Sequence, residues 1–102
     1  MNVSVVLPSF NRARLLPITI PTYFQEDVSE VILVDDCSSD NTAEVVKELQ
    51  TRFPTLRYFR NEVNSKQPYT QNVAISKVQS EYIYFGDDDS VLYPGSIRNL
   101  LN

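Results

Sequence analysis

The sequence predicts an α/β domain with a mainly parallel sheet, and three observations support this prediction. Four short apolar or aromatic runs, at residues 3–7, 31–34, 56–59 and 82–85, have the length of β-strands. Segments that suit helices separate these runs. The first, second and fourth runs are apolar almost throughout, which is typical of parallel strands covered on both faces.

Three helices are expected between the strands. In residues 42–53, apolar side chains recur at helical spacing after a polar segment in which Asp40 or Asn41 would cap the helix. A second helix is expected at residues 67–78, and a third at residues 14–25, where two prolines interrupt the pattern. The alternation of strands and helices predicts a Rossmann-like three-layer sandwich.

The chain is expected to form a single domain over residues 1–102, because no repeat, low-complexity run or Gly/Ser linker divides it. Arg57 and Arg60, in and after the third run, predict that this strand lies at an edge of the sheet. Residues 90–102 begin a further helix and stop within its first turns, so we expect the domain to be cut short at its C-terminus.

Composition excludes several classes of function. The 102 residues carry a net charge of −4 at pH 7, and the nine Lys and Arg are spread along the chain, so we expect neither nucleic acid nor an anionic membrane surface as a partner. No apolar stretch approaches the ~20 residues of a membrane span and no secretion signal starts the chain, which favours a cytoplasmic protein. With one Cys and no His, the chain can form neither an internal disulfide, nor a Cys/His zinc site, nor a Ser-His or Cys-His catalytic pair.

Acidic residues follow two of the predicted strands, at the edge where an open parallel sheet binds its ligands. Asp35 and Asp36 come after the second strand, and residues 87–89 are three consecutive Asp after the fourth. Carboxylates two positions apart in an extended chain lie about 6–7 Å from each other and repel by roughly 2–3 kcal/mol. A divalent cation such as Mg²⁺ or Mn²⁺, completed by ligand phosphates and water, would offset this repulsion and implies a nucleotide-type ligand.

Purely structural roles are the alternative for the same residues. Asp35, Asp36 and the polar residues after them could form only a turn and a helix cap, and residues 87–89 could form a solvated acidic loop. Asn11 could cap the first helix. Cys37 is expected to be small and half-buried, and the six Tyr to be packing residues with polar tips.

Three segments, taken in order, resemble the family 2 glycosyltransferases with the GT-A fold. Residues 3–12 end in PSFNR, which resembles the family's P-[TS]-[YF]-N-R turn, and residues 32–42 resemble its V-D-D-G-S-x-D-x-T segment. Residues 81–89 are similar to E-Y-I-x-F-L-D-D-D, which contains the D-x-D metal motif, and residues 93–95 match the x-P-G that follows it. The resemblance implies part of a GT-A fold.

The resemblance also implies a site for a nucleoside-diphosphate sugar, with a UDP-sugar favoured. Its expected nucleotide-sugar-binding residues are Pro8, Phe10, Asn11, Asp35, Asp36, Lys66, Gln71, Asp87 and Asp88. Phe10 would pack on the base together with Pro8, and Asp36 would accept a hydrogen bond from the base. Asp89, with Asp87, would hold the Mg²⁺ or Mn²⁺ that bridges the two phosphates.

The sequence departs from the family pattern at several positions. Gln71 stands where the family has the Arg that faces the diphosphate, and Lys66 stands in place of a Gly, so Lys66 is the candidate for the missing cation. Cys37 also replaces a Gly, which requires that its φ be negative or that the turn be rebuilt.

The family's catalytic domain is longer than this chain, and its second half carries the acceptor site and the general base. The resemblance therefore implies the donor-binding part of a metal-dependent, inverting glycosyltransferase, inactive by itself, with no catalytic base in the chain. The acceptor hydroxyl could belong to a saccharide, a lipid or a protein, and the parent protein could associate with the inner face of a membrane. Apolar surface left exposed predicts either a homodimer or low stability. The alternatives are a non-catalytic nucleotide- or metal-binding module and, less favoured, a receiver-type phospho-acceptor domain.

Overall fold

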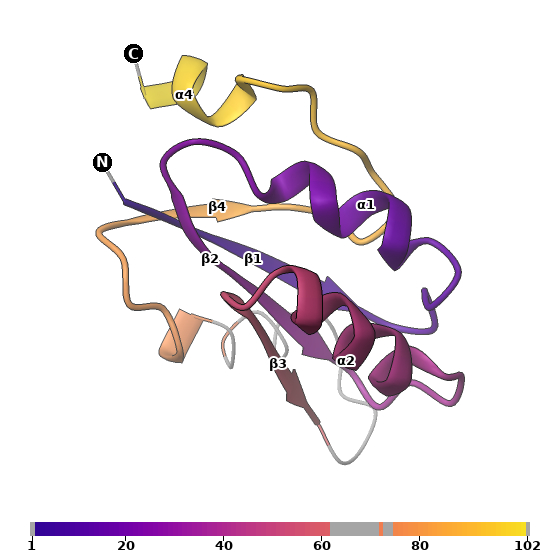
Figure 1. The fold of residues 1–102 in the computed structure, drawn as a ribbon. Helices are drawn as coiled ribbons and strands as arrows, with labels where there is room; N and C mark the ends of the chain where they lie inside the picture. The colour runs from indigo at the N-terminus through magenta and orange to yellow at the C-terminus, as the bar shows by residue number, and fades with distance from the viewer. Residues whose placement is uncertain (1, 62–71, 73–74, 102) are drawn as a thin grey trace.

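The computed structural model describes residues 2–61, 72 and 75–101, which form one parallel β-sheet with helices packed on it (Figure 1). The described elements are β1 (Val3–Ser9), α1 (Leu16–Tyr23), β2 (Val28–Asp35), α2 (Thr42–Arg52), β3 (Leu56–Arg60), β4 (Tyr82–Phe85) and α4 (Ser96–Leu101). The α/β class and the four predicted strands are therefore confirmed. None of the described helices has the length and apolar character needed to cross a membrane.

The strand order β3-β2-β1-β4 creates a switch point between β1 and β4. The chain moves outward from β1 through β2 to β3, and then returns to add β4 on the other side of β1, with all pairings parallel. The register pairs Ser9 with Asp35 and Val6 with Phe85, so the carboxyl ends of the strands meet at one edge. In open α/β sheets ligands bind at such an edge, at the switch point.

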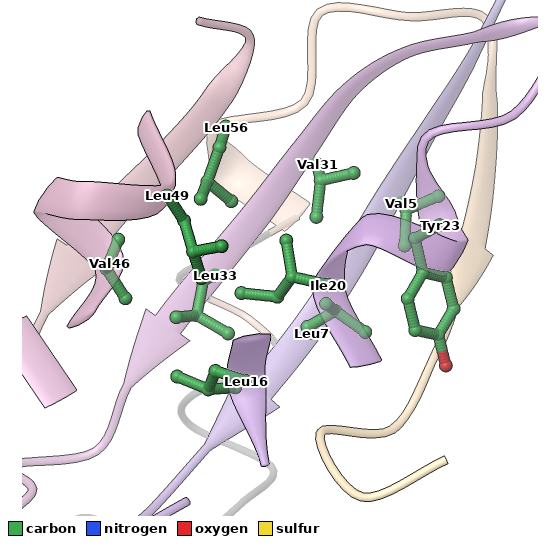
Figure 2. Close-up of a cluster of buried hydrophobic side chains, with 10 residues drawn as sticks. All are labelled: Val5, Leu7, Leu16, Ile20, Tyr23, Val31, Leu33, Val46, Leu49 and Leu56. Carbon is green, nitrogen blue, oxygen red and sulfur yellow. The ribbon is translucent and has the colours of Figure 1, made fainter. Parts of the chain in front are cut away.

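Both faces of the central strands are buried, which explains why their sequences are apolar without alternation. Val5 and Leu7 of β1, with Val31 and Leu33 of β2, pack against α1 and α2, which lie on the same face of the sheet (Figure 1). Figure 2 shows this larger cluster: Val5, Leu7, Leu16, Ile20, Tyr23, Val31, Leu33, Val46, Leu49 and Leu56. On the opposite face Val6, Ile32 and Val34 form a smaller cluster with Phe59 and Val78.

Helix α1 is shorter than the 14–25 predicted, and its two prolines give the reason. Pro17 lies in the first turn, where its missing N–H costs no helical hydrogen bond. Pro21 lies inside the helix and cannot donate to the carbonyl four residues earlier, and the helix ends two residues later, at Tyr23. Helix α2 agrees with its prediction to within one residue.

The edges of the sheet bring one confirmation and one correction. β3 is an edge strand, as Arg57 and Arg60 predicted. β4 is the other edge, so the expectation that the fourth run is covered on both faces is wrong: Tyr82, Ile83 and Phe85 are 42%, 38% and 49% exposed. An apolar strand pattern cannot distinguish a central strand from an edge that carries exposed apolar side chains.

The two remaining helix predictions lie partly outside the described residues. Of residues 67–78, the structure describes residue 72 and residues 75–78, and residues 72, 75 and 76 are helical. The helix expected within residues 90–102 begins at Ser96, after a turn in which Gly95 has a φ of 80°.

Candidate functional site

The loops after β1 and β4 meet at the switch point of the sheet. The backbone N–H of Phe10 donates a hydrogen bond to Oδ2 of Asp88 at 3.4 Å, although the two residues are 78 positions apart. Nε of Arg12 lies 3.6 Å from Oδ1 of the same carboxylate. The Phe10 side chain is 43% exposed and Pro8 is half-buried beside it. The structure thus brings together an exposed aromatic ring and the acidic run at the edge where ligands of such folds bind.

The three consecutive Asp do not share one environment. The Asp88 side chain is 15% exposed, whereas Asp87 and Asp89 are exposed. Burial raises the pKa of Asp88, and the hydrogen bond from Phe10 N–H and the charge of Arg12 partly oppose that rise. The middle carboxylate is therefore held inside the loop, and the outer two carboxylates face solvent.

Side chains of α1 hold the backbone of the acidic run. The hydroxyl of Tyr23 accepts a hydrogen bond from Asp87 N–H at 3.1 Å and donates one to Asp87 C=O at 3.2 Å. The Thr19 hydroxyl donates to Asp88 C=O at 3.2 Å. Sequence reasoning assigned Tyr23 to packing, which is correct for its ring but misses its hydroxyl. The sequence feature that could have indicated this role is a Tyr, instead of a Phe, on a buried helix face, because a buried hydroxyl needs a hydrogen-bond partner.

Asp35 is fully buried, and its carboxylate is engaged within the protein. It accepts hydrogen bonds from the N–H and hydroxyl of Ser38, from the hydroxyl of Tyr58 at 2.5 Å and from Nη1 of Arg60 at 3.0 Å. Burial and the hydrogen bond to Asp35 raise the pKa of Tyr58 to about 12. The structure therefore places Asp35 beneath the loop after β2 instead of on its surface.

Asp36 links the ends of three strands. Its N–H donates to the carbonyl of Ser9, at the end of β1, at 2.8 Å. Its Oδ1 accepts a hydrogen bond from Nδ2 of Asn61, directly after β3, at 3.1 Å. Asp36 is 8% exposed and lies at the carboxyl edge, as predicted. Two of the predicted ligand residues, Lys66 and Gln71, lie outside the described residues.

The loops after β1 and β2 are joined by polar side chains. Oδ1 of Asn11 accepts a hydrogen bond from Ser39 N–H at 2.8 Å, and Oδ2 of Asp40 accepts one from Ala13 N–H at 3.1 Å. Oδ1 of Asp40 accepts one from the N–H of Thr42, the first residue of α2, at 3.1 Å. The N-cap residue itself is Asn41, and its side chain makes no cap hydrogen bond. The suggestion that Asn11 caps the first helix is wrong, since α1 has no side-chain cap.

Cys37 is half-buried as expected, but its backbone conformation is not the one expected. Its φ is 64°, in the left-handed region, so the requirement for a negative φ is not met. A residue with a side chain is disfavoured in this conformation, so the backbone is strained at Cys37. Nη2 of Arg60 lies 3.8 Å from the sulfur.

The residues present fit a divalent cation that also binds phosphate. Within the described part of the chain, no group of three or more Asp, Glu, Cys or His is arranged to hold a metal ion. Mg²⁺ is commonly bound by one or two carboxylates, with substrate phosphates and water completing its shell. Asp87 and Asp89, both exposed at the carboxyl edge, can supply those two carboxylates.

The fold is that of GT-A glycosyltransferases. A crystal structure of S. aureus TarS 1-349 in complex with UDP-GlcNAc matches with a TM-score of 0.87 and 26% identity, covering 99% of this chain and 30% of that chain. The mannosyltransferase PcManGT from Pyrobaculum calidifontis, in complex with GDP-Man and Mn²⁺, matches with a TM-score of 0.90, 98% coverage of this chain and 31% of its own; at 22% identity it shows the fold alone.

The chain belongs to glycosyl transferase family 2, whose family model matches residues 4–102. A GalNAc(5)-diNAcBac-PP-undecaprenol beta-1,3-glucosyltransferase from Campylobacter jejuni is 34% identical, in an alignment 102 positions long that covers 97% of this chain and 33% of that protein. The poly(ribitol-phosphate) beta-N-acetylglucosaminyltransferase TarP from Staphylococcus aureus is 32% identical over 98% of this chain and 32% of its own length. The chain thus spans about a third of the length of these relatives.

Proposed function

We propose that this chain forms the donor site of an inverting glycosyltransferase, which transfers a sugar from a nucleoside-diphosphate sugar to an acceptor hydroxyl. Family membership supports the reaction class. The observation that carries the proposal for this chain is the hydrogen bond from Phe10 N–H to Asp88, which joins an exposed aromatic ring to the acidic run at the switch point. A UDP-sugar is the favoured donor, since the related TarS structure holds UDP-GlcNAc.

The base of the nucleotide is proposed to bind between the loops after β1 and β2. The exposed ring of Phe10 offers a flat apolar surface for a base, with Pro8 beside it. Asp36 would accept a hydrogen bond from the base, and Asn61 holds this carboxylate in position. Asp35 and Asn11 would not contact the base directly but would hold the loops around it in place through their hydrogen bonds.

The diphosphate is proposed to bind at the acidic run. Asp89 and Asp87 would hold Mg²⁺ or Mn²⁺, and Asp87 would also approach the ribose. A cation bound there supplies charge neutralisation for the departing nucleoside diphosphate. Asp88 would hold Asp87 and Asp89 in place, because its carboxylate binds the N–H of Phe10 and lies beside the guanidinium of Arg12. No general base is assigned in this chain, and we expect the 102 residues alone to turn over little or no donor.

Calorimetric titration of UDP, with and without Mn²⁺, tests the donor site. The unchanged protein should bind UDP more tightly with Mn²⁺, and Asp89→Ala should lower that gain by about 10–100-fold, a range typical of disturbed metal sites. Glu81→Ala is the matched control, because it removes an exposed carboxylate just before the opposite end of β4. Absence of UDP binding by the folded protein, or an Asp89→Ala variant that keeps the full gain, would contradict the proposal.

The same preparations separate an enzyme from a binding module. A parent protein that contains this chain should release UDP from a UDP-sugar when an acceptor is present, and Asp89→Ala in that protein should abolish the release. Binding of UDP with no transfer by the parent, over a panel of UDP-sugars and acceptors, would favour the non-catalytic module.

A further inference from the structure

The acidic run is attached to α1 through its backbone, not through its carboxylates. Tyr23 makes two hydrogen bonds to the backbone of one residue: its hydroxyl accepts from Asp87 N–H and donates to Asp87 C=O. Thr19, one helical turn earlier, donates to Asp88 C=O. These bonds fix the path of the chain through the run and leave the side chains of Asp87 and Asp89 exposed to solvent.

The ring that carries this hydroxyl is itself held firmly. Tyr23 is 2% exposed, and Figure 2 shows its hydroxyl oxygen directed away from the aliphatic cluster. The residue before the run, Gly86, packs directly on the ring, because a Cβ at this position would lie 2.6 Å from Cε1 of Tyr23. The Tyr84 ring lies 6.3 Å away, centroid to centroid. The hydroxyl therefore has little freedom to move.

We infer that Tyr23 is a positioning residue for the cation, because its hydroxyl holds the backbone of the run and so keeps Asp87 and Asp89 in one arrangement before the cation binds. This inference rests on the proposed function. A loop that is already ordered loses less conformational entropy when the cation and the diphosphate bind, and affinity rises accordingly. The ring alone would serve packing equally well, so the hydroxyl is the atom on which the inference depends.

Tyr23→Phe tests the inference, because it removes the hydroxyl and keeps the ring. Tyr84→Phe is the matched control, since the hydroxyl of Tyr84 makes no hydrogen bond to the residues that the structure describes. We expect Tyr23→Phe to reduce the gain in UDP affinity from Mn²⁺ by about tenfold, as disturbed supports of metal sites typically do. UDP affinity without metal should stay unchanged in both variants, because the base contacts are retained.

Amide hydrogen exchange of residues 86–89 without any ligand provides a second measurement. These amides should exchange faster in Tyr23→Phe than in Tyr84→Phe or the unchanged protein. Thermal unfolding of each variant verifies that it is folded.

The outcomes separate the inference from the proposed function. The inference would be overturned if Mn²⁺ raised the UDP affinity of Tyr23→Phe as much as that of the unchanged protein, or if the variant lost equal UDP affinity with and without Mn²⁺. In both cases UDP binding by the unchanged protein would still support the donor site. If the unchanged protein binds no UDP, the proposed function fails and this inference fails with it.

Discussion

The side-chain carbonyl of Asn11, in the loop after β1, accepts a hydrogen bond from the backbone N–H of Ser39, in the loop after β2. In the opposite direction, Asn11 N–H donates to the hydroxyl of Ser38 at 2.9 Å. Asn11 has a φ of 53°, a left-handed conformation that Asn adopts more readily than most residues. The two loops that we propose to enclose the base are thus joined by one side chain and its own backbone.

Two substitutions at Asn11 separate the hydrogen bond from the backbone conformation. Asn11→Gly removes the side chain and tolerates the positive φ, so it should lower the free energy of unfolding by about 1 kcal/mol. Asn11→Ala adds the strain of a left-handed Ala and should cost about 2 kcal/mol or more. Urea denaturation measures both. Equal stabilities for Asn11→Ala and the unchanged protein would contradict this account.

Cys37→Gly should stabilise the protein. A non-glycine residue in the left-handed region costs roughly 1–2 kcal/mol. Gly removes this cost, but its greater freedom in the unfolded chain cancels part of the benefit, so the free energy of unfolding should rise by about 0.5–1 kcal/mol. Cys37→Ala is the control, because it removes the sulfur near Arg60 and keeps the strained Cβ. If thermal unfolding shows Cys37→Gly to be no more stable than Cys37→Ala, the strain is not significant.

Gly86→Ala should destabilise the protein by roughly 1–3 kcal/mol, the usual cost of adding a methyl group to a packed site. The new Cβ would lie 2.6 Å from Cδ2 of Leu7 and from Cε1 of Tyr23, so these side chains must move. Leu7→Val removes the δ-carbons, and the double variant should be more stable than the sum of the two single effects predicts. Chemical denaturation of all four proteins measures the coupling, and strict additivity would show that the Leu7 side chain does not clash with the new Cβ.

Glu30 should make stability depend on pH in the acid range. Burial opposes ionisation, but hydrogen bonds from the Ser4 hydroxyl, Gln79 N–H and Arg57 outweigh it, so the pKa of Glu30 is lowered from 4.5. A lowered folded pKa gives stability that is present above pH 4.5 and is lost as the pH falls through the folded pKa.

Glu30→Gln should therefore cost about 1–3 kcal/mol at pH 7, because it leaves the partly buried Arg57 without its charge partner. The difference from the unchanged protein should shrink below pH 4.5. Glu48→Gln, at an exposed position on α2, is the control and should have no measurable effect. Urea denaturation from pH 3 to pH 7 measures the difference, and a value that is constant over this range would refute the assignment.

The edge strand β4 should mediate dimerisation of the isolated chain. Its outer edge pairs with no other described strand, and Tyr82, Ile83 and Phe85 are exposed along it, a combination that favours pairing with a second copy. Ile83→Lys should shift sedimentation toward the monomer, whereas Ile18→Lys, on exposed α1 surface, should not. A strictly monomeric species at high protein concentration would rule out this dimer.

Much of the fold could be predicted because its signals are local. The strand at residues 82–85 was predicted with the bounds observed, and the others differ only at their ends. The position of α2 follows from apolar spacing and from a polar start at Asp40. The limits of α1 were less accurate, since the effect of Pro17 and Pro21 depends on which helical turn each occupies.

The candidate site was predictable in part, for the same reason. The rule that ligands bind at the carboxyl ends of parallel strands indicated Asp36 and residues 87–89, and the family resemblance indicated Phe10. The structure places all of them at that edge. The predicted strand ended at Val34, so the rule could not show that Asp35 is the last residue of β2. Strand alternation directs its side chain to the face of Val31 and Leu33, where it meets the hydroxyl of Tyr58 from β3.

The sequence by itself determined the alternation of strands and helices, the acidic character of one edge and the three motifs of the family. Only the tertiary structure decided that β4 lies beside β1, that Asp88 meets Phe10 and that the Tyr23 hydroxyl holds Asp87. The physical reason is that local pattern depends on side chains a few positions apart. Contacts such as that between residues 10 and 88 depend instead on which edge of the sheet β4 joins. The amino-acid pattern of a short segment does not determine the strand beside which that segment pairs.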